Sequence, residues 1–338
     1  MKKLASFLPI LFIFLMSACG AHKTAPKMVP GKESIYNHPS VAVITKQMEA
    51  EPKNAALYYK RAMALRQLQE DSLALMDLQT AVSMDSTKAP YFSAIGEMMF
   101  EHKDMEGSVK WFKKAISIDA KDPVAHLKFA KMLMFISDNQ QAFKEINTVL
   151  RQDPYNAEAY FLKGMVYKNM NDTAKALSSF QTSVQVDPGY QPSILQLAMI
   201  YAVKKDSLAL HYFDNAFAAD TTQMVALHGK AMFYQDNGQL EKAKLEYKKC
   251  VLHDPQYADA FFNMGWILMQ QDSLDKAIRQ FNMVTKIEPG NAEAYYNRGV
   301  CFELLKRKPE ALADYKQALE FADDYKEAAA GVKRLSAQ

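Results

Sequence analysis

Apolar and small residues recur along this chain with a period of 34 residues, from Ala55 to Tyr325. If Ala55 is position 1, position 8 is always Ala or Gly and position 24 is always large and apolar. A period of this length is typical of stacked helical hairpins, in which each repeat buries its apolar face against the next. The fifth copy is one residue short, and we place its deletion in the internal turn near Lys204 to Ser207. The pattern predicts eight hairpins, at 55–88, 89–122, 123–156, 157–190, 191–223, 224–257, 258–291 and 292–325.

Three columns of this pattern explain one another. Position 20 is small in every copy, so positions 8 and 20 let two antiparallel helices approach closely. The bulky residue at position 24 then fills the adjacent gap, as Phe180 does beside Gly164 in the fourth copy. Position 7 is basic in four copies, and we expect the aliphatic stems to pack while the charges reach water. These basic residues are Arg61, Lys163, Lys230 and Arg298.

Both ends of the repeat region carry further predicted elements. Residues 38–54 predict a leading helix that stands alone ahead of the first hairpin. Residues 326–338 predict a capping helix with a polar outer face, in which 328–330, Val332 and Leu335 share one side. Residues 19–37 are mostly polar or small and include Pro26 and Pro30, so they predict a tether without fixed structure.

The repeat resembles the tetratricopeptide repeat family, and the resemblance covers about four-fifths of the chain. The last copy, with Ala292-Glu293-Ala294-Tyr295-Tyr296-Asn297-Arg298-Gly299, is similar to the family's usual first helix. The resemblance implies an all-α, right-handed superhelical solenoid of eight hairpins. It also implies a protein that binds other proteins or peptides.

The family lines its concave groove with first-helix positions 2, 5, 9, 12 and 13. Positions 5, 9 and 12 of this chain give a partner-binding groove rich in methionine and aromatic residues. Methionine is flexible, so such a surface can repack around varied apolar partners. In the alternative, some of these residues pack against neighbouring repeats and never meet a ligand. The predicted groove residues are Tyr59, Met63, Phe100, Leu127, Lys131, Phe161, Met165, Leu195, Met199, His228, Met232, Phe262, Trp266 and Tyr296.

The first 18 residues have the features of a secretory leader. Two lysines precede an apolar run that is too short to span a bilayer comfortably. The sequence Leu15-Met16-Ser17-Ala18-Cys19 resembles a bacterial lipobox, which implies that Cys19 becomes the acylated first residue of a lipoprotein. An ordinary signal peptide that happens to contain a cysteine is the alternative. Because Gly20 and not Asp follows, the resemblance to sorted lipoproteins favours the outer membrane of a cell envelope, facing the periplasm.

Six Asp-Ser or Asp-Thr pairs fall in predicted turns. With the residue that follows, they resemble a short O-glycosylation motif of Bacteroidota envelope proteins. Helix capping is the alternative, because Ser, Thr and Asp side chains satisfy free N–H groups at helix starts. The candidate hydroxyl residues are Ser72, Ser86, Thr173, Ser207, Thr221 and Ser273.

Charge and composition exclude other classes of function. The chain has 41 basic and 38 acidic residues, and this near balance argues against nucleic acid as the ligand. No phosphate loop, zinc-binding histidine pair or serine elbow is present, so we expect no enzyme, metal, cofactor or small-molecule substrate. Cys250 and Cys301 fall at core positions of the sixth and eighth copies.

The sequence therefore predicts a membrane-anchored scaffold or adaptor that binds an envelope protein or peptide in its groove. A protein that binds peptidoglycan or another glycan is the alternative. In that case Phe262, Trp266 and Tyr296 would be stacking platforms for sugar rings.

Overall fold

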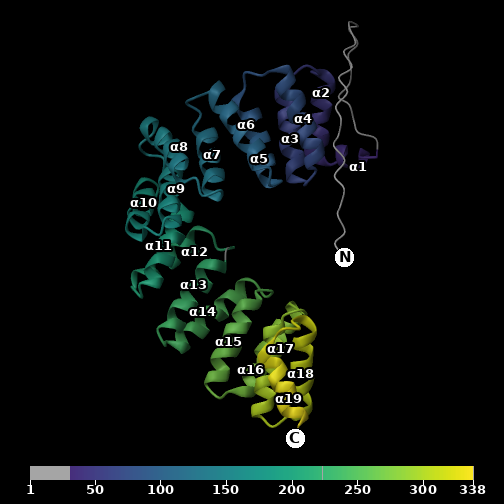
Figure 1. Ribbon diagram of the computed structural model, residues 1–338, viewed down its shortest axis with the longest axis vertical. Helices are drawn as coiled ribbons and strands as arrows, with labels where there is room; N and C mark the ends of the chain where they lie inside the picture. Colours follow the sequence, from purple (N-terminus) through teal and green to yellow (C-terminus); the bar gives the residue numbers. More distant parts are fainter. Residues whose placement is uncertain (1–30, 223, 338) are drawn as a thin grey trace. The chain divides into compact units, whose positions relative to one another are not determined.

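A computed structural model describes residues 31–222 and 224–337 of the chain. Within these ranges the chain forms nineteen α-helices and no β-strand (Figure 1). The predicted all-α class is therefore confirmed. The leader, Cys19 and most of the predicted tether lie outside the described residues, so predictions about them stay predictions.

Sixteen of the helices form eight consecutive hairpins. The first helix of each hairpin begins at the residue that the sequence analysis counts as position 1, and every second helix except α12 has fourteen residues. The pairs are α3 Ala55–Gln67 with α4 Asp71–Met84, α5 Ala89–Glu101 with α6 Met105–Ile118, α7 Pro123–Phe135 with α8 Asn139–Gln152, α9 Ala157–Asn169 with α10 Thr173–Val186, α11 Gln191–Val203 with α12 Leu208–Ala219, α13 Met224–Asp236 with α14 Leu240–His253, α15 Ala258–Gln270 with α16 Leu274–Ile287, and α17 Ala292–Leu304 with α18 Lys308–Phe321.

The chain divides into two compact units, Met1–Lys128 and Phe129–Gln338, and helix α7 crosses the boundary. In the first unit, α3 packs on α4, α4 on α5, and α5 on α6. In the second unit, each helix from α9 to α19 packs on the helix before it (Figure 1). Each unit is thus a stack of helical hairpins with a core between neighbouring layers.

The turns inside the hairpins share one backbone geometry. Each holds one residue in the left-handed region, with φ between 54° and 71°, although only Gly238 is a glycine. In the first hairpin this residue is Gln69, and the N–H of Glu70 donates to the carbonyl of Leu65 over 3.0 Å. The turn therefore satisfies carbonyls at the end of the first helix and reverses the chain in three residues.

Glycine at position 8 lies directly against the ring at position 24. A Cβ atom added to Gly164 would lie 2.5 Å from the Phe180 ring, and one added to Gly299 would lie 2.9 Å from Tyr315. Gly96 and Gly265 face Phe112 and Phe281 in the same way. Where position 8 is alanine in the first and third hairpins, position 24 is the smaller Leu78 or Ile146. The predicted complementarity of these columns is confirmed in these six hairpins, whereas the sixth copy combines Ala231 with Tyr247.

The fifth hairpin departs from this scheme. Its internal turn keeps the residue in the left-handed region. The missing residue is in the first turn of α12, because the N–H of Ala209 donates to the carbonyl of Asp206, three residues earlier, whereas the N–H of Ala74 in the first hairpin donates to Glu70, four residues earlier. The deletion was thus predicted slightly too early. The ring of Phe213 in this hairpin lies against Gly229 of the next one, where an added Cβ would be 2.4 Å away.

The expectation that position 7 charges reach water is wrong for Arg61, whose side chain is 1% exposed. Its Nε donates to Asp77 over 2.6 Å and its Nη2 over 2.8 Å. Arg298 makes the same two-bond contact with Asp314 in the eighth hairpin. Lys230 is nearly buried as well and pairs with Asp214 at 2.6 Å. Burial removes water from these cations, so each requires an acidic partner from a second helix.

The first described residues correct the predicted tether. Residues 33–36 form a short helix, α1 Glu33–Tyr36, which precedes the leading helix α2 Pro39–Ala50. The Tyr36 side chain is buried, and its ring lies 5.2 Å from the guanidinium carbon of Arg61. Lys32 pairs with Glu70 at 2.8 Å. Residues 32–36 are therefore part of the folded unit, because this segment covers the open face of the first hairpin.

The predicted capping helix is α19 Lys326–Ser336, which packs on α18 (Figure 1). Its buried stripe is Ala328, Gly331 and Leu335, whereas 329–330 are exposed, so the predicted side was partly wrong. Arg334 donates two hydrogen bonds, each 2.7 Å long, to Glu303 on α17. These hydrogen bonds lower the pKa of Glu303, so the end of the stack is held by a charged pair.

Candidate functional site

A pocket of about 280 Å³ lies between α11 and α13 in the second unit, with α12 contributing one wall residue. It brings together three of the predicted groove residues, Met199, His228 and Met232. Its remaining lining is mostly apolar, with one acidic residue at the end of α13. The other lining residues are Ala202, Val203, Phe213, Val225, Gly229, Phe233 and Asp236.

The missing side chain at Gly229 opens this pocket. Because Phe213 occupies the space where a Cβ of Gly229 would stand, α13 presents bare backbone beside the ring. Met199 and Met232 are 37% and 43% exposed, and Val203 is 87% exposed. Four large apolar side chains, with Val225 as the fourth, thus remain in contact with water around one concavity. Such a cluster is typical of a site that binds an apolar partner group.

His228 forms the polar side of the pocket. Its Nε2 lies 3.2 Å from the amide nitrogen of Asn263, and its ring lies 5.6 Å from the rings of Tyr247 and Tyr257. Burial lowers the pKa of His228 below the usual 6.5, although the negative charge of Asp259 opposes this shift. The imidazole is therefore neutral near pH 7, so an apolar ligand can cover it without burying a positive charge.

The lowered pKa of His228 predicts a loss of stability in mild acid. Well above pH 6.5 the imidazole is neutral in both the folded and the unfolded chain. As pH falls below 6.5, the unfolded chain binds a proton that the folded chain does not, so the free energy of unfolding decreases. We expect His228→Gln to flatten this decrease in urea titrations at a series of pH values. Parallel curves for the variant and the wild type would contradict the assignment.

The remaining groove residues do not meet at one site. Leu127 was predicted to contact a ligand, but its side chain is only 4% exposed, so that prediction is wrong. Lys131 is exposed but pairs with Glu158 at 2.6 Å. The others are partly buried. Several pack against buried cores or neighbouring rings, which agrees with the alternative that some groove residues pack within the protein. These partly buried residues are Tyr59, Met63, Phe100, Phe161, Met165, Leu195, Phe262, Trp266 and Tyr296.

The aromatic residues proposed as sugar platforms are engaged with other rings. The ring of Tyr296 lies 5.0 Å from that of Tyr325 and 5.7 Å from that of Tyr315. The ring of Phe262 lies 5.7 Å from that of Phe281. These contacts reduce the ring surface that a glycan could cover, so the structure gives the glycan alternative no added support.

Four residues at the pocket's edge and floor are not among the predicted groove residues. Val225 occupies position 2, and Val203 and Asp236 occupy position 13, which the family also uses for its groove. Including positions 2 and 13 in the predicted groove would have identified these three residues. Gly229 at position 6 carries no such signal, because its role depends on the ring of Phe213 from the preceding hairpin.

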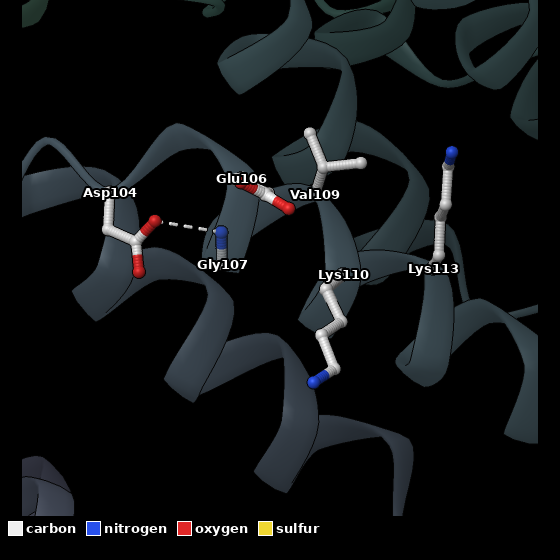
Figure 2. A pocket seen from close by; sticks show the side chains of 6 residues that line it. All are labelled: Asp104, Glu106, Gly107, Val109, Lys110 and Lys113. Atoms are coloured by element: carbon white, nitrogen blue, oxygen red, sulfur yellow. Dashed lines mark hydrogen bonds between the residues drawn. The ribbon is translucent and has the colours of Figure 1, made fainter.

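A larger hollow of about 640 Å³ lies over α6, but it has no convergent polar groups. Figure 2 shows that Asp104 accepts a hydrogen bond of 2.9 Å from the N–H of Gly107, which caps the helix. The side chains of Lys110 and Lys113 point away from each other (Figure 2). All the lining residues belong to α6 or its capping residue, so this hollow is a stretch of open helix surface.

The described residues contain no cluster of three or more side chains able to hold a metal ion. Cys250 and Cys301 are fully buried, as predicted, and burial raises the pKa of each thiol to about 12. Neither thiol is ionised near neutral pH, so neither has the reactivity of a catalytic cysteine. None of the helices described is long and apolar enough to cross a membrane.

In four of the six turn motifs, aspartate rather than the hydroxyl residue accepts a hydrogen bond from a backbone N–H; these are Asp85, Asp172, Asp206 and Asp220. Asp172 accepts a hydrogen bond from the N–H of Lys175, and Asp206 accepts one from the N–H of Leu208. In the described part of the chain, none of the six candidate hydroxyls makes a side-chain hydrogen bond, and all but the half-buried Ser273 are exposed. Hydrogen bonding to the backbone therefore accounts for four of the six aspartates but not for Asp71 and Asp272, and glycosylation of the hydroxyls stays a prediction.

Comparison with known families identifies the class of repeat. Models of the tetratricopeptide repeat match residues 157–190, 236–299 and 292–328. Together with the eight hairpins, these matches show that the chain contains tetratricopeptide repeats. Proteins built from this repeat are protein-interaction scaffolds.

Individual relatives match the chain at low sequence identity. The DnaJ homolog subfamily C member 7 homolog of Dictyostelium discoideum is 24% identical over 187 residues, which are 50% of this chain and 34% of that protein. The DnaJ protein P58IPK homolog of Arabidopsis thaliana is 22% identical over 294 residues, with 82% and 57% covered. The chain thus spans a third to just over half of these relatives.

A solved structure agrees with this assignment. The C-terminal part of a TPR repeat-containing protein from Cytophaga hutchinsonii superposes with a TM-score of 0.57 at 16% identity. The superposition covers 70% of this chain and 98% of that one, so it supports the hairpin fold alone.

Proposed function

We propose that this chain is a membrane-anchored scaffold that binds an apolar segment of an envelope protein or peptide in the pocket between α11 and α13. The observation that carries the proposal is the cluster of exposed Met199, Val203, Val225 and Met232 around one concavity of about 280 Å³. That volume fits one or two apolar side chains of a partner. The flexible methionines can adjust to their shapes.

The electrostatics of the pocket support an apolar ligand with a polar or basic neighbour. His228 is neutral near pH 7 because burial lowers its pKa, and Asp236 is the one carboxylate in the lining. A peptide that inserts apolar side chains beside Met199 and Met232 could place a basic residue near Asp236. An acidic peptide would meet repulsion there.

The anchoring part of the proposal rests on the sequence. The lipobox resemblance at Leu15–Cys19 supports acylation of Cys19, and Gly20 after it supports the outer membrane facing the periplasm. An acyl-anchored scaffold would hold its partner near the membrane without catalysing a reaction. Gel mobility and intact mass of the wild type and Cys19→Ser would test acylation independently of partner binding.

Replacing both pocket methionines is expected to remove partner binding. Peptides selected from a displayed library against the wild-type protein serve as ligands, and affinity is measured by fluorescence anisotropy. Met199→Asn with Met232→Asn should weaken binding by about 100-fold, since each apolar side chain covered by a ligand contributes roughly 1.5 kcal/mol. Both side chains are exposed, so the far-ultraviolet circular dichroism spectrum should not change.

The matched control is Leu208→Asn on α12. Leu208 is 47% exposed, similar to the two methionines, but it does not line the pocket. This control should leave peptide affinity unchanged. Unaltered binding by the methionine double variant, or an equal loss in the control, would place the binding surface elsewhere.

A further inference from the structure

A second concavity lies on another face of the second unit and has the opposite chemistry. It has a volume of about 380 Å³ and is formed by α14 and α16, with two residues of α15 between them. Its charged rim contains four basic residues and a single acidic one. The lining residues are Glu241, Lys244, Leu245, Lys248, Met264, Leu268, Lys276, Arg279 and Gln280.

Three of these cations are available to a ligand. Lys244 is committed to Glu241 at 2.7 Å and to the amide oxygen of Gln271 at 2.8 Å. Among the described residues, the side chains of Lys248, Lys276 and Arg279 form no ion pair and no hydrogen bond. Each of the three lines the same concavity, so they offer one anionic group several donors at once.

The positive charge is concentrated on these two helices. Together α14 and α16 carry seven lysine and arginine residues and three acidic ones, whereas the whole chain has a net charge of +3. One of the three acidic residues, Glu246, is buried and pairs with Lys249 at 2.9 Å. The outer face of α14 and α16 therefore attracts an anionic surface more strongly than the rest of the chain does.

Exposed leucines lie on the same face as the cations. Leu245 is 57% exposed and Leu252 is 81% exposed. With Lys248 they follow the spacing i, i+3 and i+7, so all three side chains project from one side of α14. Large aliphatic side chains beside lysines match the boundary between phospholipid headgroups and acyl chains, where the apolar groups insert and the cations contact phosphate.

We propose that the outer face of α14 and α16 binds the surface of a bilayer that contains anionic phospholipids. Lys248, Lys276 and Arg279 would hold headgroup phosphates in the concavity, and Leu245 and Leu252 would enter the acyl boundary. This contact is separate from the pocket between α11 and α13 and does not depend on acylation of Cys19. It would orient the second unit on the membrane, independently of any anchor at Cys19.

The test is co-sedimentation of the full chain with vesicles of phosphatidylcholine, with and without phosphatidylglycerol. All proteins carry Cys19→Ser, so that an acyl chain cannot hold them on the vesicles. We expect binding to require phosphatidylglycerol and to fall with rising salt. Lys276→Gln with Arg279→Gln should weaken it roughly 30-fold, since each basic residue near such a surface contributes about fivefold. Leu252→Ser should weaken it by about tenfold.

The matched control is Lys110→Gln with Lys113→Gln on α6, which removes the same charge from a hollow without convergent cations. This control should bind like the parent protein. An equal loss in the control, or equal binding to vesicles without phosphatidylglycerol, would overturn the proposal. Binding to soluble poly-glutamate but not to phosphatidylglycerol vesicles would also overturn it, because the ligand would then be an acidic protein. Free phosphate should compete only weakly, because it offers no apolar phase to the leucines.

Discussion

Replacing Arg61 with methionine is expected to lower the free energy of unfolding of the first unit by about 3–5 kcal/mol. Arg61 is 1% exposed and makes two hydrogen bonds to Asp77, which is itself buried. Methionine has a similar length but no charge, so the carboxylate of Asp77 would remain buried without its partner. The cost comes from this uncompensated charge more than from lost packing.

The same pair also connects α1 and α2 to the first hairpin. The Arg61 guanidinium lies 3.5 Å from the hydroxyl of Thr45 on α2 and contacts the rings of Tyr36 and Tyr58. Burial raises the pKa of Asp77, and the Arg61 guanidinium only partly opposes this shift. The buried pair is therefore costly to form. Its role is to fix the position of α1 and α2 on the first hairpin, with little net gain in stability.

The double variant Arg61→Met with Asp77→Leu tests this explanation. An apolar pair of similar volume should recover most of the stability lost by Arg61→Met alone, because no buried charge remains. Urea unfolding measures the free energies, and amide hydrogen exchange in α2 to α4 shows where protection is lost. Lys175→Met breaks an exposed pair with Asp172 and should change stability by less than about 1 kcal/mol. A single variant as stable as the wild type would contradict the role of Arg61.

Replacing Gly164 with alanine is expected to destabilise the second unit by about 1–3 kcal/mol, although alanine is the better helix former. The added Cβ would lie 2.5 Å from the ring of Phe180, which is fully buried. The ring cannot move without disturbing the contact between α9 and α10. Overpacking at this crossing therefore outweighs the gain in helix propensity.

A compensating substitution should reverse this loss. Gly164→Ala with Phe180→Leu reproduces the pairing of Ala62 with Leu78 in the first hairpin. We expect the double variant to be more stable than the sum of the two single changes predicts, by about 0.5–3 kcal/mol. Thermal and urea unfolding of the four proteins complete the cycle. Additive effects would mean that the two positions do not constrain each other.

Several features of this protein follow from its sequence alone. The 34-residue period predicts where each hairpin starts, because every repeat must bury the same stripe against its neighbour. The columns at positions 8 and 24 predict which side chains meet at the helix crossings, as Gly164 and Phe180 do. These contacts lie within one hairpin and recur at Gly96, Gly265 and Gly299, so periodicity is enough to find them.

The groove was only partly predictable, because repeat position does not determine how exposed a side chain is. Met199 and Met232 occupy equivalent positions of adjacent repeats and do lie in one pocket, as the resemblance implied. Leu127 occupies position 5, as the pocket residue His228 does, but it is buried. Repeat position therefore indicates the direction of a side chain, whereas its exposure depends on the particular neighbours of each copy.

Only the tertiary structure decided how individual residues break the repeat. It pairs Arg61 with Asp77 in the core, turns Phe213 toward Gly229 and so opens the pocket, and folds residues 33–36 into a helix that covers the first hairpin. It also places the unpaired cations of α14 and α16 around one concavity. Each of these depends on which side chains from different helices compete for the same space or the same charge. A periodic pattern describes what the copies share, and these contacts arise where neighbouring copies differ.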